Sequence, residues 1–243
     1  MRTTEVIQRE YYERTAHSYD AAHVRDGDEH YLALRHIAGF FDVLGISSVL
    51  DVGCGTGRGV KYFLEKRPAM TVHGVEPVDA LIDRAVHANC VPPGSIIKGS
   101  GDALPFADRS FDAVFECGIL HHVKEPDQVV REMMRVSRKA VFLSDENRFA
   151  HGTTFGRWAK LLLCKMRMFR AAYLLKTAGK GYRFSEGDGL AYSYSVFDAL
   201  EVLSEWSDRV IVIPTDEVKT KSLFHPLLTS FHVLLCAVRD GGN

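Results

Sequence analysis

Cysteine is sparse and irregularly spaced in this chain of 243 residues. There are five cysteines, an odd number, and no two of them form a C-x-x-C pair; they are Cys54, Cys90, Cys117, Cys164 and Cys236. This pattern argues against a disulfide framework and against a zinc site built from paired cysteines. We therefore expect reduced thiols, as in proteins of the cytosol.

Long hydrophobic runs are also lacking. No stretch of about 18 apolar residues occurs, the length that a membrane-spanning helix needs. The first twenty residues, MRTTEVIQREYYERTAHSYD, are too highly charged for a secretory signal. We expect a cytoplasmic protein without a transmembrane segment.

The chain has almost no net charge. The formal charge is −1, so the composition as a whole shows no bias towards an anionic partner such as nucleic acid. Hydrophobic residues make up 46% of the sequence, which is enough for a full core. We expect a single domain over residues 1–243.

Segments typical of strands and of helices alternate from residue 48 onwards. The expected strands are 48–52, 70–75, 95–98, 111–115 and 140–143. The expected helices are 30–44, 58–64, 78–88 and 127–136. This alternation predicts an α/β fold with a doubly wound, mostly parallel sheet and helices on both faces. Such sheets bind ligands in the loops at the carboxyl ends of their strands.

A glycine-rich turn follows the first expected strand, in VLDVGCGTG. Asp51 ends the strand, and Gly53, Gly55 and Gly57 alternate after it. The spacing differs from the dinucleotide pattern G-x-G-x-x-G, and no Lys-Ser or Lys-Thr pair follows to make a phosphate-binding loop. An acidic residue before the glycines repels a pyrophosphate but suits an ammonium or sulfonium group. The turn therefore favours a ligand with a cationic group.

Two more acidic residues follow the next two expected strands. Glu76, in GVEP, lies where a carboxylate can accept hydrogen bonds from both hydroxyls of a ribose. Asp102, in GDALPF, can accept a hydrogen bond from an adenine amino group. Together with Asp51, they indicate an adenosine with a cationic tail.

Four segments, VLDVGCGTG, GVEP, GDALPFADRSFDAVF and ILHHV, resemble the successive motifs of class I S-adenosylmethionine-dependent methyltransferases. The subgroup is type 11, the ubiquinone/menaquinone-biosynthesis-like enzymes, and the resemblance covers about residues 11–143. It implies a seven-stranded sheet of order 3-2-1-4-5-7-6 whose last strand is antiparallel, completed here by 210–213 and 231–238. It also implies S-adenosylmethionine as methyl donor and S-adenosylhomocysteine as product.

The resemblance further implies which residues contact the methyl donor. Gly53 and Gly55 would lie against its methionine portion, Asp51 would support its amino group, and Glu76 would bind the ribose. The N-terminal segment 1–44 would form a helical cover over the donor. The full expected set is Tyr19, Asp51, Gly53, Gly55, Glu76, Pro77, Asp102, Ala103, Cys117 and His122.

His121 and His122 follow the fourth expected strand, at the mouth of the predicted site. Methyl transfer from a sulfonium needs a nucleophile held in line and free of its proton, and an imidazole is a suitable base near neutral pH. We therefore predict a catalytic role for these histidines, with His122 preferred. The alternative is that both only cap the turn and line the donor pocket. No helix carries ligands at a spacing such as H-x-x-x-H, so the sequence predicts no metal.

The positive charge of the chain is concentrated after the fifth expected strand. Residues 147–185 contain nine Lys or Arg residues and no Asp or Glu. Apolar side chains recur there at steps of three or four, which predicts one basic amphipathic helix. The stripe consists of Phe155, Trp158, Leu162, Met166, Phe169 and Tyr173.

We expect residues 147–194 to form a lid that contacts the methyl acceptor. Arg167 and Arg170 would bind it together with Tyr192 and Tyr194 of the polar, turn-rich loop that follows. This predicts a small, anionic or sugar-containing acceptor that is methylated on O or N. The alternatives are a solvated lid helix, an RNA contact and an anionic membrane surface.

Other functions stay open at this point. A tRNA methyltransferase and a quinone C-methyltransferase are alternative enzymes, and a non-catalytic cofactor-binding module is an alternative outside catalysis, because fold alone does not establish activity. The intact acidic residues Asp51, Glu76 and Asp102 argue against the module.

Overall fold

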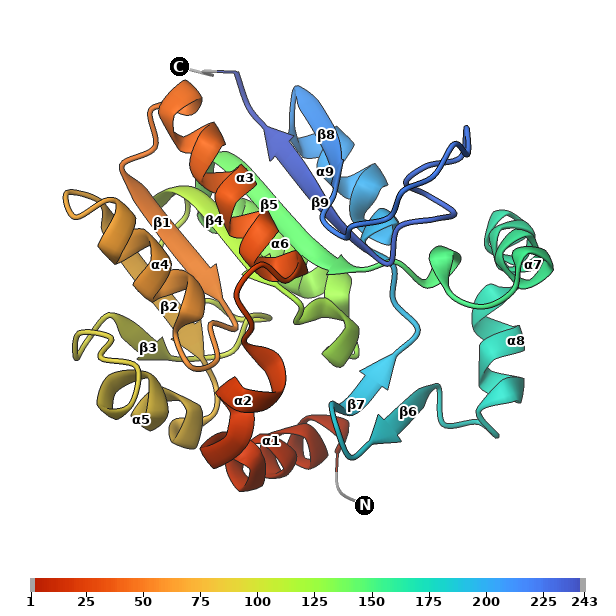
Figure 1. Cartoon of the computed structure of the whole chain (residues 1–243), viewed down its shortest axis with the longest axis horizontal. Coiled ribbons are helices and arrows are strands. Elements are labelled where there is room, and N and C mark those ends of the chain that lie inside the picture. The colour runs from red at the N-terminus through yellow and green to blue at the C-terminus, as the bar shows by residue number, and fades with distance from the viewer. Residues whose placement is uncertain (1–2, 241–243) are drawn as a thin grey trace.

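A seven-stranded sheet crosses the centre of the molecule in the computed structural model, which describes residues 3–240 (Figure 1). The strand order is β3-β2-β1-β4-β5-β9-β8. Strand β9 is antiparallel to both of its neighbours, and the other pairs are parallel. The strands are β1 Ser48–Val52, β2 Thr71–Glu76, β3 Ile96–Lys98, β4 Phe111–Cys117, β5 Ser137–Glu146, β8 Arg209–Pro214 and β9 His232–Val238.

This architecture confirms the predicted sheet. Strands β8 and β9 are the sixth and seventh strands of the expected order 3-2-1-4-5-7-6, and β9 is the antiparallel one. They are numbered eight and nine only because a separate two-stranded hairpin, β6 Tyr182–Ser185 and β7 Gly189–Tyr192, precedes them in the chain.

Helices cover both faces of the sheet. One face is covered by α3 Glu29–Leu44, α4 Arg58–Lys66 and α5 Asp79–His87, which contribute to one hydrophobic cluster. The opposite face is covered by α6 Pro126–Val136 and α9 Leu200–Trp206, which contribute to a second cluster. The central strands are therefore buried on both sides, which explains their nearly continuous apolar sequences.

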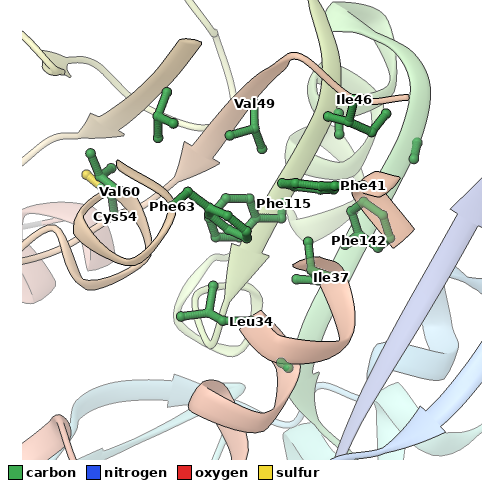
Figure 2. Packing of buried hydrophobic residues seen from close by; sticks show 14 of the residues in the cluster. Leu34, Ile37, Phe41, Ile46, Val49, Cys54, Val60, Phe63, Phe115 and Phe142 are labelled. Carbon is green, nitrogen blue, oxygen red and sulfur yellow. The ribbon is translucent and has the colours of Figure 1, made fainter. Parts of the chain in front are cut away.

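Side chains of the central strands alternate between these two clusters. Phe115 and Phe142 point towards α3 and α4, where the ring of Phe63 lies 4.8 Å from that of Phe41 and 5.4 Å from that of Phe115 (Figure 2). Their neighbour Val114 points to the opposite cluster. Each fully buried aromatic side chain contributes roughly 2–3 kcal/mol to folding, so this core fixes the strand ends that carry the site.

The carboxyl ends of the strands are covered by the N-terminal segment and the hairpin (Figure 1). The segment comprises α1 Thr4–Thr15, the 3-10 turn Ala16–Ser18 and α2 Tyr19–His23. The hydroxyl of Tyr11 donates to the carbonyl of Glu186 at 2.9 Å, and Gln8 Oε1 accepts from the amide of Leu190 at 2.6 Å. Helix α1 and the hairpin therefore form one cover.

The segment after β5 differs from the sequence-based expectation in two ways. The prediction of a single basic helix is wrong. Two helices, α7 Thr154–Lys165 and α8 Phe169–Lys176, are separated by a turn in which Arg167 has φ 58°. The prediction of a polar, turn-rich loop after it is also wrong, because these residues form the hairpin β6–β7. The described residues contain no helix that is long and apolar enough to cross a membrane.

Candidate functional site

The turn after β1 places three glycines in left-handed conformations. Gly53, Gly55 and Gly57 have φ of 69°, 53° and 79°, which side-chain-bearing residues rarely adopt. The amide of Gly53 donates to the carbonyl of Val75 at 2.8 Å, which ties the turn to the end of β2. A Cβ on Gly57 would lie 2.7 Å from Val91 Cγ2, so close packing requires glycine there as well.

Glu76 reaches from the end of β2 to support the same turn. Its Oε2 accepts from the amide of Gly55 at 2.9 Å and its Oε1 from the amide of Val78 at 3.0 Å. Burial raises the pKa of Glu76 to about 7, although these two hydrogen bonds oppose the shift. Each carboxylate oxygen can accept a second hydrogen bond, so Glu76 can still bind two hydroxyl groups of a ligand.

Asp51 is buried at the end of β1, beneath the first turn of α4. Burial and the neighbouring charge of Glu76 raise the pKa of Asp51 to about 8, against the hydrogen bond from the amide of Val60. A buried carboxyl group of this kind carries a proton near neutral pH. A cationic group of a ligand favours the ionised form and would displace that proton.

A first cavity, of about 610 Å³, opens beside the glycine turn. Eight of the ten residues predicted to contact the methyl donor lie in its wall, namely Tyr19, Gly53, Gly55, Glu76, Pro77, Asp102, Cys117 and His122. Asp51 lies instead in the wall of the neighbouring cavity. Ala103 is exposed and lies outside both walls.

A second cavity, of about 410 Å³, adjoins the first one. The two cavities share the wall residues Tyr12, Tyr19, Gly53, Cys117, Gly118 and His122. The rest of the second cavity is rich in ionisable side chains, which include Arg25, Asp28, Glu29, His30, Arg58, His121, Glu146, Asp188 and His232. A ligand that lies on the glycine turn in the first cavity therefore has one end facing the polar second cavity.

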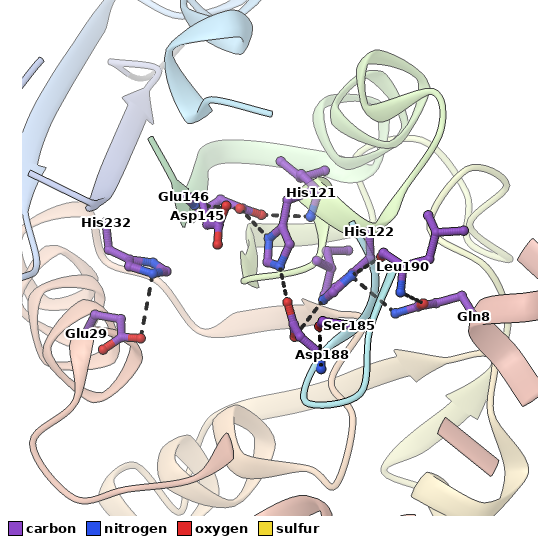
Figure 3. A network of polar contacts seen from close by, with 12 residues as sticks. Gln8, Glu29, His121, His122, Asp145, Glu146, Ser185, Asp188, Leu190 and His232 are labelled. Carbon is purple, nitrogen blue, oxygen red and sulfur yellow. Dashed lines mark hydrogen bonds and ion pairs between the residues drawn. The ribbon is translucent and has the colours of Figure 1, made fainter. Parts of the chain in front are cut away.

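The predicted catalytic histidines lie on the 3-10 turn Leu120–His122, which follows β4 (Figure 3). His121 Nδ1 lies 2.7 Å from Asp145 Oδ1. His122 Nδ1 lies 2.6 Å from the carbonyl of Leu190 and 3.2 Å from Gln8 Nε2. Asp188, in the hairpin turn, lies 3.8 Å from His121 Nε2 and 3.4 Å from His122 Nε2.

The charges of this network depend on one another. Burial disfavours a charge on His121, but the carboxylates of Asp145 and Asp188 outweigh it and raise the pKa of His121 well above its usual range. Burial also disfavours a charge on Asp188, but its contacts with His121 and His122 outweigh this and hold the pKa of Asp188 well below its usual range.

All four ring nitrogens of the two histidines thus have a partner in the structure. Either histidine could accept a proton from a substrate only after Asp188 moves away from its Nε2. The base role of His122 or His121 stays a prediction, and it requires motion of the hairpin.

The four residues predicted to bind the acceptor line a third cavity, of about 410 Å³. Arg167 and Arg170 are exposed, and Tyr192 also lies in the wall of the first cavity. Tyr194 Oη is buried and has no hydrogen-bond partner within residues 3–240, and the same holds for Arg148 Nε in that wall. The third cavity therefore offers unused donors, but neither His121 nor His122 lines it.

Sequence reasoning missed three aspartates that organise the site. Asp20 of α2 accepts from Thr56 Oγ1 at 2.5 Å and from Arg84 Nε at 2.6 Å, which holds the N-terminal cover against the glycine turn. Asp145 and Asp188 position the histidine pair. No local spacing links these residues to their partners, so only the fold reveals them.

A parallel sheet of this order, with an acidic residue before a glycine turn and a carboxylate at the end of the next strand, defines the class I S-adenosylmethionine-dependent methyltransferase fold. Residues 50–143 match the type 11 family, described as a methyltransferase domain. The resemblance seen in the sequence is therefore confirmed for residues 50–143.

Curated relatives are named as methyltransferases. A protein of Mycobacterium marinum named as an uncharacterized methyltransferase is 41% identical over 93 residues, which are 37% of this chain and 35% of that protein. One of Mycolicibacterium gilvum, with the same name, is 38% identical over the same coverage. The chain thus matches about a third of the length of these relatives.

Solved structures share the fold over nearly the whole chain. Magnesium protoporphyrin IX methyltransferase of Synechocystis, with bound S-adenosylhomocysteine, has a TM-score of 0.58 at 16% identity and covers 97% of this chain and 100% of its own. A methyltransferase of Thermotoga maritima, described as a possible histamine N-methyltransferase, has a TM-score of 0.57 at 15% identity and covers 95% and 99%.

Proposed function

We propose that this protein transfers a methyl group from S-adenosylmethionine to an O or N atom of a small acceptor molecule. The observation that carries the proposal is the wall shared by the first two cavities, at Cys117, Gly118 and His122. A methyl donor that lies along the first cavity, with its methionine end on the glycine turn, has its reactive end at this junction.

The residues of the first cavity fit such a donor. Gly53 and Gly55 lack a Cβ, which lets a ligand approach the backbone, and a Cβ on Gly55 would lie 3.4 Å from Tyr19 Oη. Glu76 would accept hydrogen bonds from the ribose hydroxyls, and Asp51 would pair with the ammonium group. When bound, the donor supplies an activated methyl group, so the chain mainly has to orient the two reactants and exclude water.

We further propose that the acceptor carries an anionic group that binds in the third cavity. Arg167 and Arg170 have no ion-pair partner within residues 3–240, and Tyr194 Oη is an unused donor in the same wall. The first and third cavities share Val123, Lys124 and Tyr192. An acceptor with its reacting atom beside His122 would reach these cations by passing Tyr192.

Exposed apolar side chains favour a second candidate, an acceptor held in a membrane, such as a quinone. Phe155 on α7 is 84% exposed and Leu223 is 97% exposed, and Trp158 packs against Phe224 with 4.7 Å between ring centroids. These residues and the cations of α7 and α8 suit the surface of an anionic bilayer.

Calorimetry and methyl transfer test the proposal together. We expect the chain to bind S-adenosylmethionine and S-adenosylhomocysteine, and to add a methyl group to a compound from a metabolite extract that mass spectrometry identifies. Binding of the product without transfer to any compound would favour a non-catalytic module. A steep loss of affinity with salt for transfer RNA would favour the RNA alternative.

Charge reversal tests the acceptor site. With the identified acceptor, Arg167→Glu and Arg170→Glu should raise KM by roughly tenfold or more, because an ion-paired hydrogen bond is lost. Donor affinity should stay unchanged. Lys176→Glu on α8, outside the wall of the third cavity, is the matched control. Equal loss of donor affinity, or no change in KM, would assign the acceptor to another place.

A further inference from the structure

Two clusters of side chains in the second cavity have the composition of metal sites. Within each, one potential ligand atom from every residue lies within 4.8 Å of the others, among the residues that the structure describes. The clusters are His121, His122 and Asp188, and Glu29, His30 and His232. Two imidazoles and one carboxylate suit Zn²⁺ and similar divalent transition-metal ions.

We propose that His121, His122 and Asp188 bind a divalent transition-metal ion, through the Nε2 atoms of both histidines and the carboxylate. This site adjoins the proposed donor cavity at His122 and goes beyond the proposed methyl transfer. The observation behind the proposal is that Nδ1 of each imidazole ring, on the side opposite Nε2, has a hydrogen-bond partner (Figure 3).

His121 is held by a buried carboxylate. Its Nδ1 lies 2.7 Å from Asp145 Oδ1, and Asp145 is fully buried. The other oxygen of Asp145 accepts from the amide of Leu120 at 2.7 Å, which fixes the carboxylate in turn. Metal-binding histidines almost always donate their second N–H to a carboxylate or a carbonyl in this way.

His122 is held by a backbone carbonyl. The carbonyl of Leu190 lies 2.6 Å from His122 Nδ1 and can only accept, so Nδ1 carries the hydrogen. The neutral ring then has its lone pair on Nε2, which lies 3.4 Å from Asp188 Oδ1. Both imidazoles are therefore oriented with Nε2 towards the same carboxylate.

The second cluster lacks this support. His232 Nε2 lies 3.7 Å from Glu29 Oε1, but Nδ1 of His30 and Nδ1 of His232 are buried without a hydrogen-bond partner in the described part of the chain. No hydrogen bond within residues 3–240 fixes the tautomer of either ring through Nδ1. This cluster is therefore the matched control.

An ion at the proposed site would lie in the wall of the second cavity, close to the junction with the first. Three protein ligands leave coordination positions that face the cavity, so the site would take an acceptor with an oxygen or nitrogen ligand atom. Because the ion uses the lone pairs of both Nε2 atoms, His121 and His122 cannot then serve as bases.

Metal titration of the untagged full-length chain tests this proposal. After treatment with a chelator, Zn²⁺ binding is measured by calorimetry and Co²⁺ binding by its visible absorption, which reports on coordination. We expect one equivalent to bind, with a Kd in roughly the micromolar range or below. His122→Gln and Asp188→Asn should each weaken binding by at least about tenfold, while His232→Gln should not.

Three results would overturn the proposal: no saturable binding of Zn²⁺ to the unmodified chain, unchanged binding to the His122→Gln and Asp188→Asn variants, or loss of binding only with His232→Gln. Thermal unfolding followed by circular dichroism shows that each variant is folded, because His122 lies in the wall of the first cavity and its substitution can alter donor binding. Binding of S-adenosylhomocysteine by the unmodified chain without metal is measured separately, so failure of the metal site and failure of donor binding are distinguishable.

Discussion

Asp51 and Glu76 are two buried carboxyl groups, and the charge of Glu76 disfavours ionisation of Asp51. Burial is the larger cause for both, and the pKa values are raised to about 8 for Asp51 and about 7 for Glu76. A ligand that brings a positive charge to Asp51 and hydroxyl donors to Glu76 stabilises the ionised forms of both. These two residues would therefore link the proposed donor binding to pH.

Binding of S-adenosylhomocysteine should strengthen as the pH rises from about 6 to 8. In this range the free chain loses the proton of Glu76 near pH 7 and that of Asp51 near pH 8, and the ligand's ammonium group favours earlier release of the proton from Asp51. Calorimetry in buffers of different ionisation enthalpy should show protons released on binding. Asp51→Asn should weaken binding by roughly tenfold or more and flatten the pH dependence. Proton uptake, or a flat profile in the unmodified chain, would contradict this role of Asp51.

The glycine turn makes a separate prediction about stability. A side chain at Gly57 meets Val91 and Ala85, whereas at Gly45, which also has positive φ, the nearest atom is Lys139 Nζ at 3.9 Å. Gly45→Ala should therefore lower the free energy of unfolding only by the cost of placing alanine in a left-handed backbone conformation, about 1–2 kcal/mol. Gly57→Ala should cost about 1–3 kcal/mol more because of the overpacking. Urea unfolding measures both, and equal losses would show that Gly57 is not tightly packed.

At the scale of the elements, the sequence predicts the central strands well and the cover poorly. The expected strand 48–52 coincides with β1, because Val49, Leu50 and Val52 are apolar and the strand is buried on both faces. The expected strand 140–143 is shorter than β5, because β9 pairs with residues of β5 as polar as Asp145. Pairing with a distant strand leaves no local pattern.

The hairpin β6–β7 was not predictable because its contacts are made with the other end of the chain. Phe184 packs against Tyr11 with ring centroids 5.8 Å apart, and Leu190 bonds to Gln8. In the same way, the motifs that we propose to bind the donor follow single strands and are visible in the sequence, whereas Asp188 reaches the histidines only through the hairpin.

Gln8 holds the hairpin to α1, which gives a prediction for local opening. Gln8→Ala removes the acceptor for the buried amide of Leu190, a cost of about 1–3 kcal/mol. Amide hydrogen exchange in residues 182–192 should accelerate by roughly tenfold or more, while the central strands stay protected. Glu13→Ala, at an exposed position of α1, should change neither the free energy of unfolding nor the hydrogen exchange of the hairpin. Unchanged exchange in the hairpin would show that Gln8 does not hold it.

At the scale of the whole molecule, cationic and apolar side chains are exposed together on the surface of α7 and α8. Helices α7 and α8 bury no side chain completely, and they display cations beside exposed apolar residues such as Phe155 and Leu175. A solvated lid does not need exposed aromatic side chains, but a membrane-facing surface does.

Sedimentation with lipid vesicles distinguishes a membrane-facing surface from a solvated lid. We expect the chain to bind vesicles containing anionic lipid, more weakly at high salt, and Phe155→Ser with Leu223→Ser to weaken binding several-fold. Val43→Ser is the matched control, because Val43 on α3 is 82% exposed. No binding to anionic vesicles, or equal loss with the control, would contradict a membrane-facing surface.

The central claim is that S-adenosylmethionine binds in the first cavity, at the glycine turn and Glu76, and reaches Asp51 in the wall of the adjoining second cavity. Calorimetric titration of the full chain with S-adenosylhomocysteine tests it most directly, with Glu76→Gln as the comparison. We predict saturable binding at a single site and a loss of roughly tenfold or more in affinity for Glu76→Gln. Absence of binding to the unmodified chain, or identical affinity for the variant, would contradict the account.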